Sequence, residues 1–412
     1  MHDAPRRRLL LVSHRPLEYE GPGTVRWRYF IEHLPEHGWD VTTATGRTGV
    51  TSDELSADPR VARLSSLRAR VMAGVGRVTR PVANQLLGVQ PEALAPSIAW
   101  SLTGRRMLRE RIAAERPDVV VATSPPVAAL FAAGSVLRNS GIPAVADLRD
   151  PWAGHPTYDA GGPLLPRLEE RALRPFAAIV GVTPGMTERL ARLHPAVAGR
   201  LHLLPNGFAP ELLDRRAPAR VRAPGERLTL IHPGVLYGDR SVDDLLAAIA
   251  VSGLAAQLRL VLVGNLNAAS EQALRAAPAG LEVEVVGPRP WADAMDLVAA
   301  ADVVVVIVPE SMGDDVAWPV KLFEAVALGK PVLAITSGGA TEVLLGELGR
   351  PDACGRVGDV ASVIAALRHV IDAPGAPVSA ERLARWNRAT VTADYATLLD
   401  DLVRSDTREA TA

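Results

Sequence analysis

Hydrophobic and polar positions follow two alternating patterns along the chain. Short continuously apolar runs, such as Leu9–Ser13 and Asp302–Val308, are typical of strands buried on both faces of a parallel sheet. Between them lie segments such as 24–34, where Trp27, Phe30 and Ile31 recur at helical spacing. A chain that alternates strand, loop, helix and strand favours an α/β fold with parallel sheets.

The pattern predicts two such series. The predicted strands are Leu9–Ser13, Trp39–Thr45, Asp118–Thr123, Pro143–Asp147, Phe176–Thr183 and Leu201–Leu204, then Leu228–His232, Leu258–Val263, Leu281–Val286, Asp302–Val308 and Pro331–Thr336. The predicted helices after the first series are Ser241–Val251, Ala269–Ala276, Trp291–Ala300, Val320–Leu328, Thr341–Leu348, Val360–Asp372 and Ala380–Leu402. The Pro-rich, charged stretch 210–224 indicates a linker, so we expect two Rossmann-like domains with the ligand at the carboxyl ends of their strands.

Composition narrows the class of protein. The 412 residues are 48% hydrophobic with a net charge of −1, which is consistent with large cores and argues against wholesale nucleic-acid binding. Cys354 is the single cysteine, which excludes an intrachain disulfide framework. No apolar run has the length of a membrane span, and the N-terminal run is too short for a signal peptide. We therefore expect a soluble cytoplasmic protein.

Residues 60–116 are unusually basic, with 11 arginines against three acids. Two interpretations fit this segment. It forms a surface for peripheral contact with the inner membrane face or for a lipid-linked acceptor, or it forms solvated helix faces in an arginine-rich protein. Without a clean amphipathic pattern, the second interpretation is favoured.

The stretch 309–343 carries the most specific signal. It follows the strand predicted at Asp302–Val308 and passes through acids and small residues to Pro319, a residue suited to the first turn of a helix. The helix predicted over Val320–Leu328 then ends at Gly329. This is a strand, loop and helix unit whose helix N-terminus lies at the ligand edge of the sheet, where it can bind an anion.

Two side chains in the first turns of this helix make it a candidate nucleotide site. Lys321 and Lys330 are the only lysines, and every other basic residue is arginine. Lys330 lies at the helix end where a cation is favourable, whereas Lys321 lies at the unfavourable end and needs another reason to be there. Lys321 suits a phosphate, and Glu324 suits the hydroxyls of a neighbouring ribose.

Candidate chemistry in the first half follows two predicted strands. Gly21, Gly23, Thr24 and Arg26 suit close approach of a phosphate or sugar, although a plain tight turn explains the glycines equally well. At a later strand end, Asp147, Arg149, Asp150 and His155 are acceptor-side candidates, with either aspartate open as a general base. The alternative is that Arg149 pairs with an aspartate and braces the loop. A metal site is not expected, because His155 is the only further candidate ligand nearby.

In the second half, glycines and one arginine follow strand ends. Gly234 and Gly238 free the backbone, and Arg240 can meet a diphosphate with its forked donors. Gly287 and Trp291 either frame a nucleobase or, for the tryptophan, pack onto the linker.

The chain resembles retaining glycosyltransferases of family 4, which have the two-domain GT-B fold. The motifs that carry the resemblance are GPGTVR, ADLRDPW, LLPNG, HPGVLYGDR, VVGPRPWADAMDLVAAADV and, above all, PVKLFEAVALGKPVLAI. ADLRDPW together with PVKLFE resembles the branch that includes amino-sugar transferases of bacterial polysaccharides and transferases of secondary metabolism.

This resemblance implies an enzyme that moves a sugar from a UDP- or GDP-sugar to a small-molecule or lipid-linked acceptor, with retention and without a metal or other cofactor. It implies an acceptor-side domain over 1–205, a donor-binding domain over 206–380, and a C-terminal segment over 381–412 that crosses back to the first domain. The implied catalytic residues are Arg240, Lys321, Asp150 and Arg149. The implied donor-binding residues are Gly21, Gly23, Thr24, Gly234, Arg240, Gly287, Pro319, Val320, Lys321, Leu322 and Glu324. The implied acceptor-side residues are Arg26, Asp147, Arg149, Asp150 and His155.

Three departures from the family pattern affect the details. Val316 stands where the family often has a second glutamate, and Asp314, Asp315 or backbone amides are the candidate replacements. Val235 replaces a frequent arginine after Gly234, and Phe208-Ala209 follow the Pro-Asn-Gly motif, where an aspartate is usual. Donor specificity is therefore expected to differ over Gly313–Trp318. An epimerase acting on nucleotide sugars and an inactive nucleotide-sugar-binding homologue are the competing functions.

Overall fold

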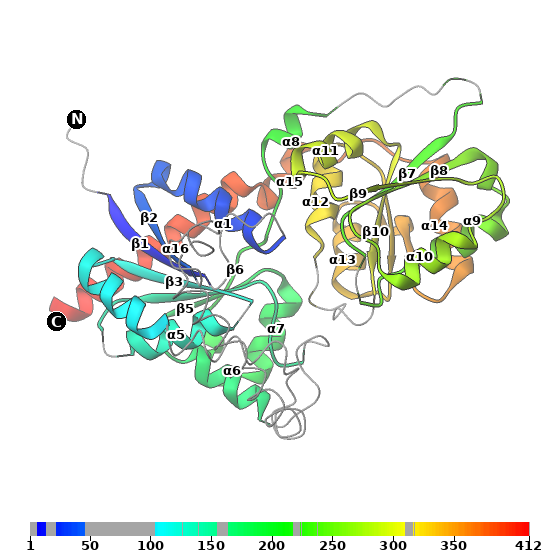
Figure 1. Cartoon of the computed structure of the whole chain (residues 1–412). Coiled ribbons are helices and arrows are strands. Elements are labelled where there is room, and N and C mark those ends of the chain that lie inside the picture. The colour runs from blue at the N-terminus through cyan, green and yellow to red at the C-terminus, as the bar shows by residue number, and fades with distance from the viewer. Residues whose placement is uncertain are drawn as a thin grey trace, which may run out of the picture. The chain divides into compact units, whose positions relative to one another are not determined.

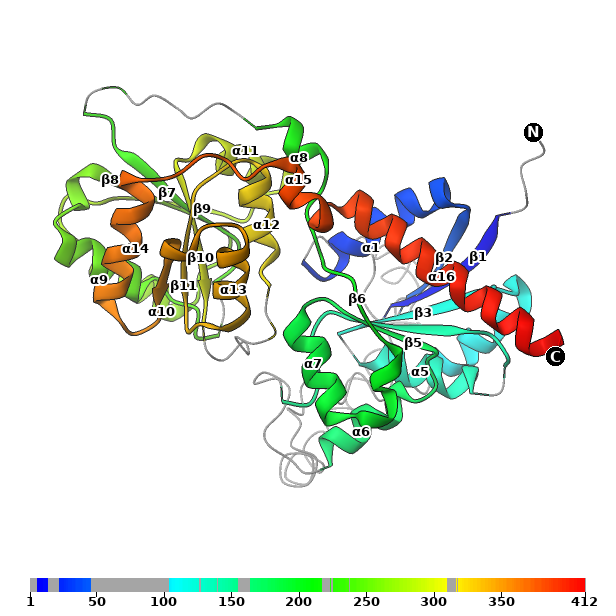
Figure 2. The same ribbon diagram turned by 180° about the vertical axis from the view of Figure 1, so that it is seen from behind.

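The computed structural model describes residues 6–13, 22–45, 104–125, 127–138, 140–154, 164–216, 223, 225–236, 238–309, 316 and 318–411. Within these residues the chain forms two compact units. Unit 1 comprises residues 1–205 and 392–412, and unit 2 comprises residues 206–391. Figures 1 and 2 show the helices and strands of each unit, including β7 (Leu228–Pro233) in unit 2. The predicted position of the interdomain linker, 210–224, is wrong, because the boundary falls after residue 205 and Leu212 is part of a buried cluster of unit 2.

Unit 1 contains a six-stranded parallel sheet in the order β2-β1-β3-β4-β5-β6. Its strands are β1 (Arg7–Ser13), β2 (Trp39–Thr45), β3 (Val119–Ser124), β4 (Ala144–Leu148), β5 (Ala178–Gly181) and β6 (Leu201–Leu203). Its helices include α1 (Pro22–His33), α5 (Ala128–Leu137), α6 (Leu165–Leu173) and α7 (Pro184–Leu193). The apolar runs Leu9–Val12 and Val119–Ala122 are fully buried, as expected for central parallel strands.

Unit 2 contains a second six-stranded parallel sheet, in the order β12-β11-β10-β7-β8-β9. After β7, its strands are β8 (Leu258–Val263), β9 (Glu282–Gly287), β10 (Val303–Val308), β11 (Val332–Thr336) and β12 (Cys354–Arg356). Its helices are α8 (Glu211–Asp214), α9 (Asp243–Ser252), α10 (Ala268–Arg275), α11 (Trp291–Ala300), α12 (Val320–Ala327), α13 (Gly339–Glu347), α14 (Val360–Asp372) and α15 (Ala380–Leu383). The predicted α/β class with two Rossmann-like parallel sheets is confirmed.

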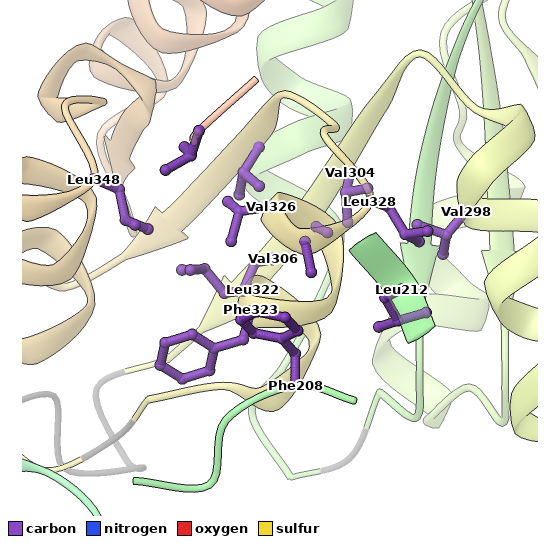
Figure 3. Close-up of a cluster of buried hydrophobic side chains, with 14 of the residues drawn as sticks. Phe208, Leu212, Val298, Val304, Val306, Leu322, Phe323, Val326, Leu328 and Leu348 are labelled. Carbon is purple, nitrogen blue, oxygen red and sulfur yellow. The ribbon is translucent and has the colours of Figure 1, made fainter. Parts of the chain in front are cut away.

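Alternate residues of the unit 2 strands pack on opposite faces of the sheet. Val304 and Val306 of β10 join a cluster that includes side chains of α11, α12 and α13, shown in Figure 3. Val303 and Val305 of the same strand join a second cluster with α9 and α14. Every residue of β10 is therefore buried, which is why the sequence shows a continuous apolar run there rather than alternation.

The helix α12 is set by its two ends and its apolar face. Pro319 is the N-cap residue, with φ −63° and ψ 125°, so it precedes the first turn instead of lying in it as predicted. Gly329 has φ +75°, and its N–H and that of Lys330 bond to the carbonyls of Val326 and Ala325 at 3.1 Å and 2.9 Å. This Schellman arrangement ends the helix where the glycine predicted it.

The last helix, α16 (Arg388–Thr411), begins in unit 2 and continues into unit 1. In unit 1, Tyr395 lies edge-on to Trp27 of α1 at 5.5 Å between ring centroids, and it also contacts Phe30 at 5.2 Å. The single helix predicted over Ala380–Leu402 is wrong in one respect. Asn387 forms a parallel bridge with Phe208, which separates α16 from α15. No helix within the described residues is both long enough and apolar enough to span a membrane.

Candidate functional site

The most distinctive polar site lies in unit 2, where the order of the strands reverses. In its sheet, β10 and β7 are neighbours, but the helices that follow them pack on opposite faces. Such a switch point leaves a crevice outside the carboxyl ends of the two strands, where open α/β sheets bind ligands. Here it brings together His232, at the end of β7, and Lys321, in the first turn of α12, with Lys321 Nζ 3.2 Å from His232 Nε2.

Glycines line the same ends of β7, β8 and β9. Gly234 has φ +127°, and a Cβ at this position would lie 2.9 Å from Lys321 Nζ. Gly264 has φ +121°, and its Cβ would lie 2.7 Å from the carbonyl oxygen of Gly234. The N–H of Gly264 bonds to the carbonyl of Gly287 at 2.9 Å. Side chains larger than glycine would therefore displace both the backbone and the lysine amine.

Arg240 is held beside this site by the loop that follows β7. Its side chain is buried. The side-chain amide of Asn267 donates to the carbonyls of Gly238 and Arg240 at 3.0 Å and 2.8 Å. Asn267 also caps α10 by accepting from the N–H of Ser270 at 2.9 Å, so one residue fixes both the loop and the helix. The positive charge of Arg240 is near enough to lower the pKa of both Lys321 and His232.

Lys321 is a half-buried cation. Burial and, to a smaller extent, the charge of Arg240 lower the pKa of Lys321 to about 7, although the carboxylate of Glu324 opposes the shift. Burial also lowers the pKa of His232 well below its ordinary value, and the charge of Lys321 acts in the same direction. His232 is therefore neutral near pH 7, and the positive charge at the site belongs to Lys321 and Arg240.

Glu324 lies one turn after Lys321 and is buried. Its Oε1 accepts a hydrogen bond from Trp291 Nε1 at 2.8 Å. Trp291 is half-buried and also packs against the hydrophobic cluster of unit 2. Leu322, predicted to contact the donor, is fully buried, and its N–H bonds to the carbonyl of Pro319 at 3.0 Å.

The second polar centre lies in unit 1 and is closed. Asp147, at the end of β4, is completely buried. One of its oxygens accepts from Trp27 Nε1 at 2.6 Å and from Thr123 Oγ1 at 3.2 Å, and the other lies 3.3 Å from Arg26 Nη2. Arg26 also donates to the carbonyl of Leu204 at 2.7 Å, and its guanidinium lies 5.1 Å from the centre of the Phe30 ring.

This closed centre changes the interpretation of two predicted acceptor-side residues. Arg26 and Asp147 join α1, β4 and the segment after β6, and neither side chain is accessible to an acceptor in this structure. Tyr395 of α16 lies against the same centre, where burial and the charge of Asp147 raise its pKa well above its ordinary value. Thr24 is also buried, at 2% exposure.

The loop after β4 presents Arg149 and Asp150, both half-buried. Arg149 donates from Nε and Nη2 to the carbonyls of Ser124 and Pro125, at 3.3 Å and 2.5 Å. Arg149 therefore braces the loop, as considered from the sequence, through bonds to two backbone carbonyls. Further along the loop, Glu169 accepts from the N–H groups of Trp152 and Ala153 at 2.5 Å and 3.2 Å and contacts His194 Nε2 at 2.8 Å.

Some predicted residues lie outside the described parts of the chain. These are Gly21, His155, Asp314 and Asp315, together with residues 60–103 of the arginine-rich segment. Gly23 lies in the first turn of α1. Val316 is described and buried, so the position of the expected second glutamate is apolar. Across the described residues, no group of three or more His, Cys, Asp and Glu side chains could hold a metal ion.

Two residues that shape these sites were not singled out from the sequence as functional. His232 was quoted only within a motif, although a histidine at the end of a buried strand and before Pro-Gly is an unusual choice. Glu169 had no signal of its own, because its partners come from a loop and from a residue 25 positions away.

Solved structures with this architecture cover nearly the whole chain. HepE of Anabaena in complex with UDP is 15% identical, with a TM-score of 0.59 over 96% of this chain and 100% of that chain. Sucrose-phosphate synthase of Thermosynechococcus elongatus is 16% identical, with a TM-score of 0.66 over 97% and 100%. The α,α-trehalose 6-phosphate synthase of Burkholderia multivorans is 14% identical, with a TM-score of 0.64 over 99% of both chains. The fold is GT-B.

Family models divide the chain as the two sheets do. Residues 21–207 match the glycosyl transferase 4-like domain, and residues 227–373 match the glycosyl transferases group 1. No curated protein sequence matches the chain. The chain belongs to the GT-B glycosyltransferases that combine these two domains, which confirms the resemblance to family 4 stated from the motifs.

Proposed function

We propose that this glycosyltransferase moves a sugar from a UDP- or GDP-sugar to an acceptor with retention of anomeric configuration and without a metal ion. The observation that carries the proposal is the pair of cations, Lys321 and Arg240, beside glycine backbone at the switch point of unit 2. Two positive charges near a helix N-terminus suit a diphosphate. HepE of Anabaena, which shares the fold, has been solved with UDP and with UDP-glucose.

In this proposal the protein acts mainly by electrostatics. Breaking the bond between the anomeric carbon and the phosphate oxygen places negative charge on the leaving diphosphate. Lys321, Arg240 and the N-terminus of α12 stabilise that charge, which lowers the barrier. The acceptor hydroxyl forms the new bond on the face that the diphosphate leaves, and its proton passes to a phosphate oxygen. Products are the glycosylated acceptor and the nucleoside diphosphate.

Glu324 is assigned to the ribose hydroxyls. Its Oε1 accepts from Trp291, which orients the carboxylate and leaves its other oxygen as the acceptor for a sugar hydroxyl. The backbone of Gly234, Gly264 and Gly287 allows close approach of the nucleotide. Recognition of the acceptor is assigned to unit 1, with Arg149 and Asp150 as its candidate contacts, because Arg26 and Asp147 are engaged in a buried pair.

The test is acceptor-dependent release of nucleotide. Purified protein is incubated with a panel of UDP- and GDP-sugars and with hydroxyl acceptors, and the released nucleoside diphosphate is measured. We expect release only when both substrates are present, an unchanged rate with excess EDTA, and an anomeric coupling constant in the product that matches the donor.

Other outcomes select another function. Interconversion of the donor without an acceptor would identify an epimerase, and binding without any turnover would identify an inactive homologue. Either result would overturn the proposed transfer. Loss of rate in EDTA that added Mg²⁺ restores would overturn the metal-free assignment.

A further inference from the structure

His232 is an interior histidine with a fixed tautomer. It is 1% exposed, and its Nδ1 lies 3.0 Å from the carbonyl oxygen of Val305 on the neighbouring strand β10. A carbonyl oxygen can only accept, so Nδ1 carries the ring proton and donates it. Because the imidazole is neutral, Nε2 keeps its lone pair and is an acceptor.

That lone pair faces the amine of Lys321. Nζ lies 3.2 Å from Nε2, and the direction of the bond is set by the tautomer, so the ammonium donates to the ring. On the other side, Gly234 leaves room for the amine, since a Cβ there would lie 2.9 Å from Nζ. The amine is therefore seated between an imidazole acceptor and a backbone without a side chain.

We propose that His232 is a positioning residue, which accepts one N–H of the Lys321 ammonium and thereby directs its remaining N–H groups toward the bound diphosphate. The inference rests on the proposed function of the site, and it adds to that function a residue that does not itself touch the donor. His232 stands in β7 and Lys321 in α12, so the contact also fixes the helix N-terminus relative to the strand.

The chemistry of a neutral acceptor explains why a histidine suits this position. Within the part of the chain that the structure describes, the charged and titratable groups near Lys321 are His232 from β7, Arg240 from the loop after β7, and Glu324 from α12 itself. A carboxylate in place of His232 would form an ion pair with Lys321 and cancel the charge that a diphosphate needs. A neutral imidazole orients the ammonium and leaves its charge available to the ligand.

Two substitutions separate the two hydrogen bonds of the ring. His232→Asn keeps a donor at the position of Nδ1, for Val305, but loses the acceptor for Lys321. His232→Gln places an amide oxygen at the position of Nε2 and restores that acceptor. We expect kcat/KM for the donor to fall roughly 10- to 100-fold in His232→Asn, as for loss of a hydrogen bond to a charged group, and to recover to within about threefold of wild type in His232→Gln.

A second measurement does not depend on turnover. The chain contains only two lysines, so protein labelled with ε-¹³C lysine gives two side-chain resonances, which a Lys330→Arg variant assigns. Because an acceptor stabilises the ammonium form, we expect the titration of Lys321 to move to lower pH in His232→Asn and to stay in place in His232→Gln. Lys330, which donates to the carbonyl of Ala301 at 2.9 Å, should titrate identically in all variants.

The Lys321 titration and the donor kinetics can each support or overturn the proposed role of His232. A Lys321 titration that is the same in His232→Asn and in wild type, or that moves to higher pH, overturns the proposal. If His232→Asn does not fold, His232→Gln decides alone, because loss of its donor kinetics or of its Lys321 titration contradicts an acceptor role. If wild-type protein turns over no nucleotide sugar, the proposed function fails, while the titration still decides whether His232 holds the ammonium.

Discussion

Each unit has a cation at the carboxyl end of its sheet. Comparing the surroundings of the two cations distinguishes a structural ion pair from a candidate ligand site. In unit 1, Arg26 faces the buried carboxylate of Asp147, and both side chains are almost fully enclosed. In unit 2, Lys321 faces a neutral imidazole and a second cation, Arg240. A cation with a buried counter-ion is neutralised within the protein. A cation left facing neutral and like-charged groups is costly unless an anion binds, which is why the second centre is the candidate donor site.

The largest expected effect is on turnover at the unit 2 centre. Lys321→Ala removes a cation assigned to the leaving diphosphate, so we expect kcat to fall by about 10²–10³-fold, measured as initial rates of nucleotide release. The melting temperature should stay the same or rise, because a cation that is costly to bury is removed. Lys330→Arg is the matched control and should retain wild-type rates. Turnover near the wild-type rate in Lys321→Ala would show that this cation does not serve the diphosphate.

At the unit 1 centre the expected effect is on stability. Asp147→Asn keeps hydrogen-bonding groups for Trp27 and Thr123 but leaves Arg26 buried without its counter-ion. We expect a loss of about 3–5 kcal/mol in the free energy of unfolding, measured by urea denaturation, whereas Asp150→Asn should change it by less than about 0.5 kcal/mol.

A double-mutant cycle with Arg26→Met sharpens this prediction. We attribute the loss of stability in Asp147→Asn to the unpaired guanidinium of Arg26. Removing that guanidinium as well should therefore restore part of the free energy of unfolding. We expect a coupling energy of at least about 1 kcal/mol. Simple additivity of the two single substitutions would mean that the ion pair is not what stabilises this centre.

Gly234→Ala tests the space that unit 2 keeps for its cation. The new Cβ would lie 2.9 Å from Lys321 Nζ at a φ of +127°, so the lysine or the loop must move. We expect a loss of about 1–3 kcal/mol in stability and roughly a tenfold loss of kcat/KM for the donor. Gly238→Ala is the matched control, since its φ is +62° and nothing lies within 4 Å of the added Cβ. An equal loss of kcat/KM in both variants would mean that backbone strain alone causes it.

The smallest expected effect is the pH dependence of nucleotide binding. The pKa of Lys321 is lowered to about 7, so its ammonium is present below that pH and is lost as the pH rises through it. If only the protonated form binds, the Kd for UDP should rise by up to about tenfold per pH unit above 7. Titration calorimetry from pH 6 to 9 measures this, with Lys321→Arg as the variant that stays charged. If Kd depends on pH in the same way in wild type and in Lys321→Arg, another group is responsible for the pH dependence.

Much of the fold could be predicted because its strands are buried on both faces. The run Val303–Val308 needs no tertiary information to be recognised, and the glycine after α12 predicted where that helix ends. The strand β12 was missed, because its three residues are Cys-Gly-Arg and carry no apolar pattern. The break before α16 was also missed, since it depends on Asn387 pairing with Phe208, far away in the sequence.

Site residues could be predicted where neighbouring residues in the sequence indicate their role, and not where that role depends on residues far away in the sequence. Lys321 and Glu324 could be proposed as a site because helix polarity and spacing are visible within a few residues. His232 was not, because its role depends on the placement of β7 next to β10, which brings the carbonyl of Val305 to its ring. Arg26 and Asp147 were predicted as acceptor-side residues, and their burial could not be predicted because it follows from packing between α1, β4 and α16.

The path of α16 has a consequence for synthesis on the ribosome. Unit 2 is continuous in sequence, so it can fold as soon as residues 206–391 have left the exit tunnel. Unit 1 is made first but is completed last, because Tyr395 of α16 packs against Trp27 and Phe30 of α1 only after residues 392–412 have been synthesised. Throughout elongation, the nascent first unit therefore exposes an aromatic surface, and a chain that terminates early would keep it exposed to proteases and chaperones.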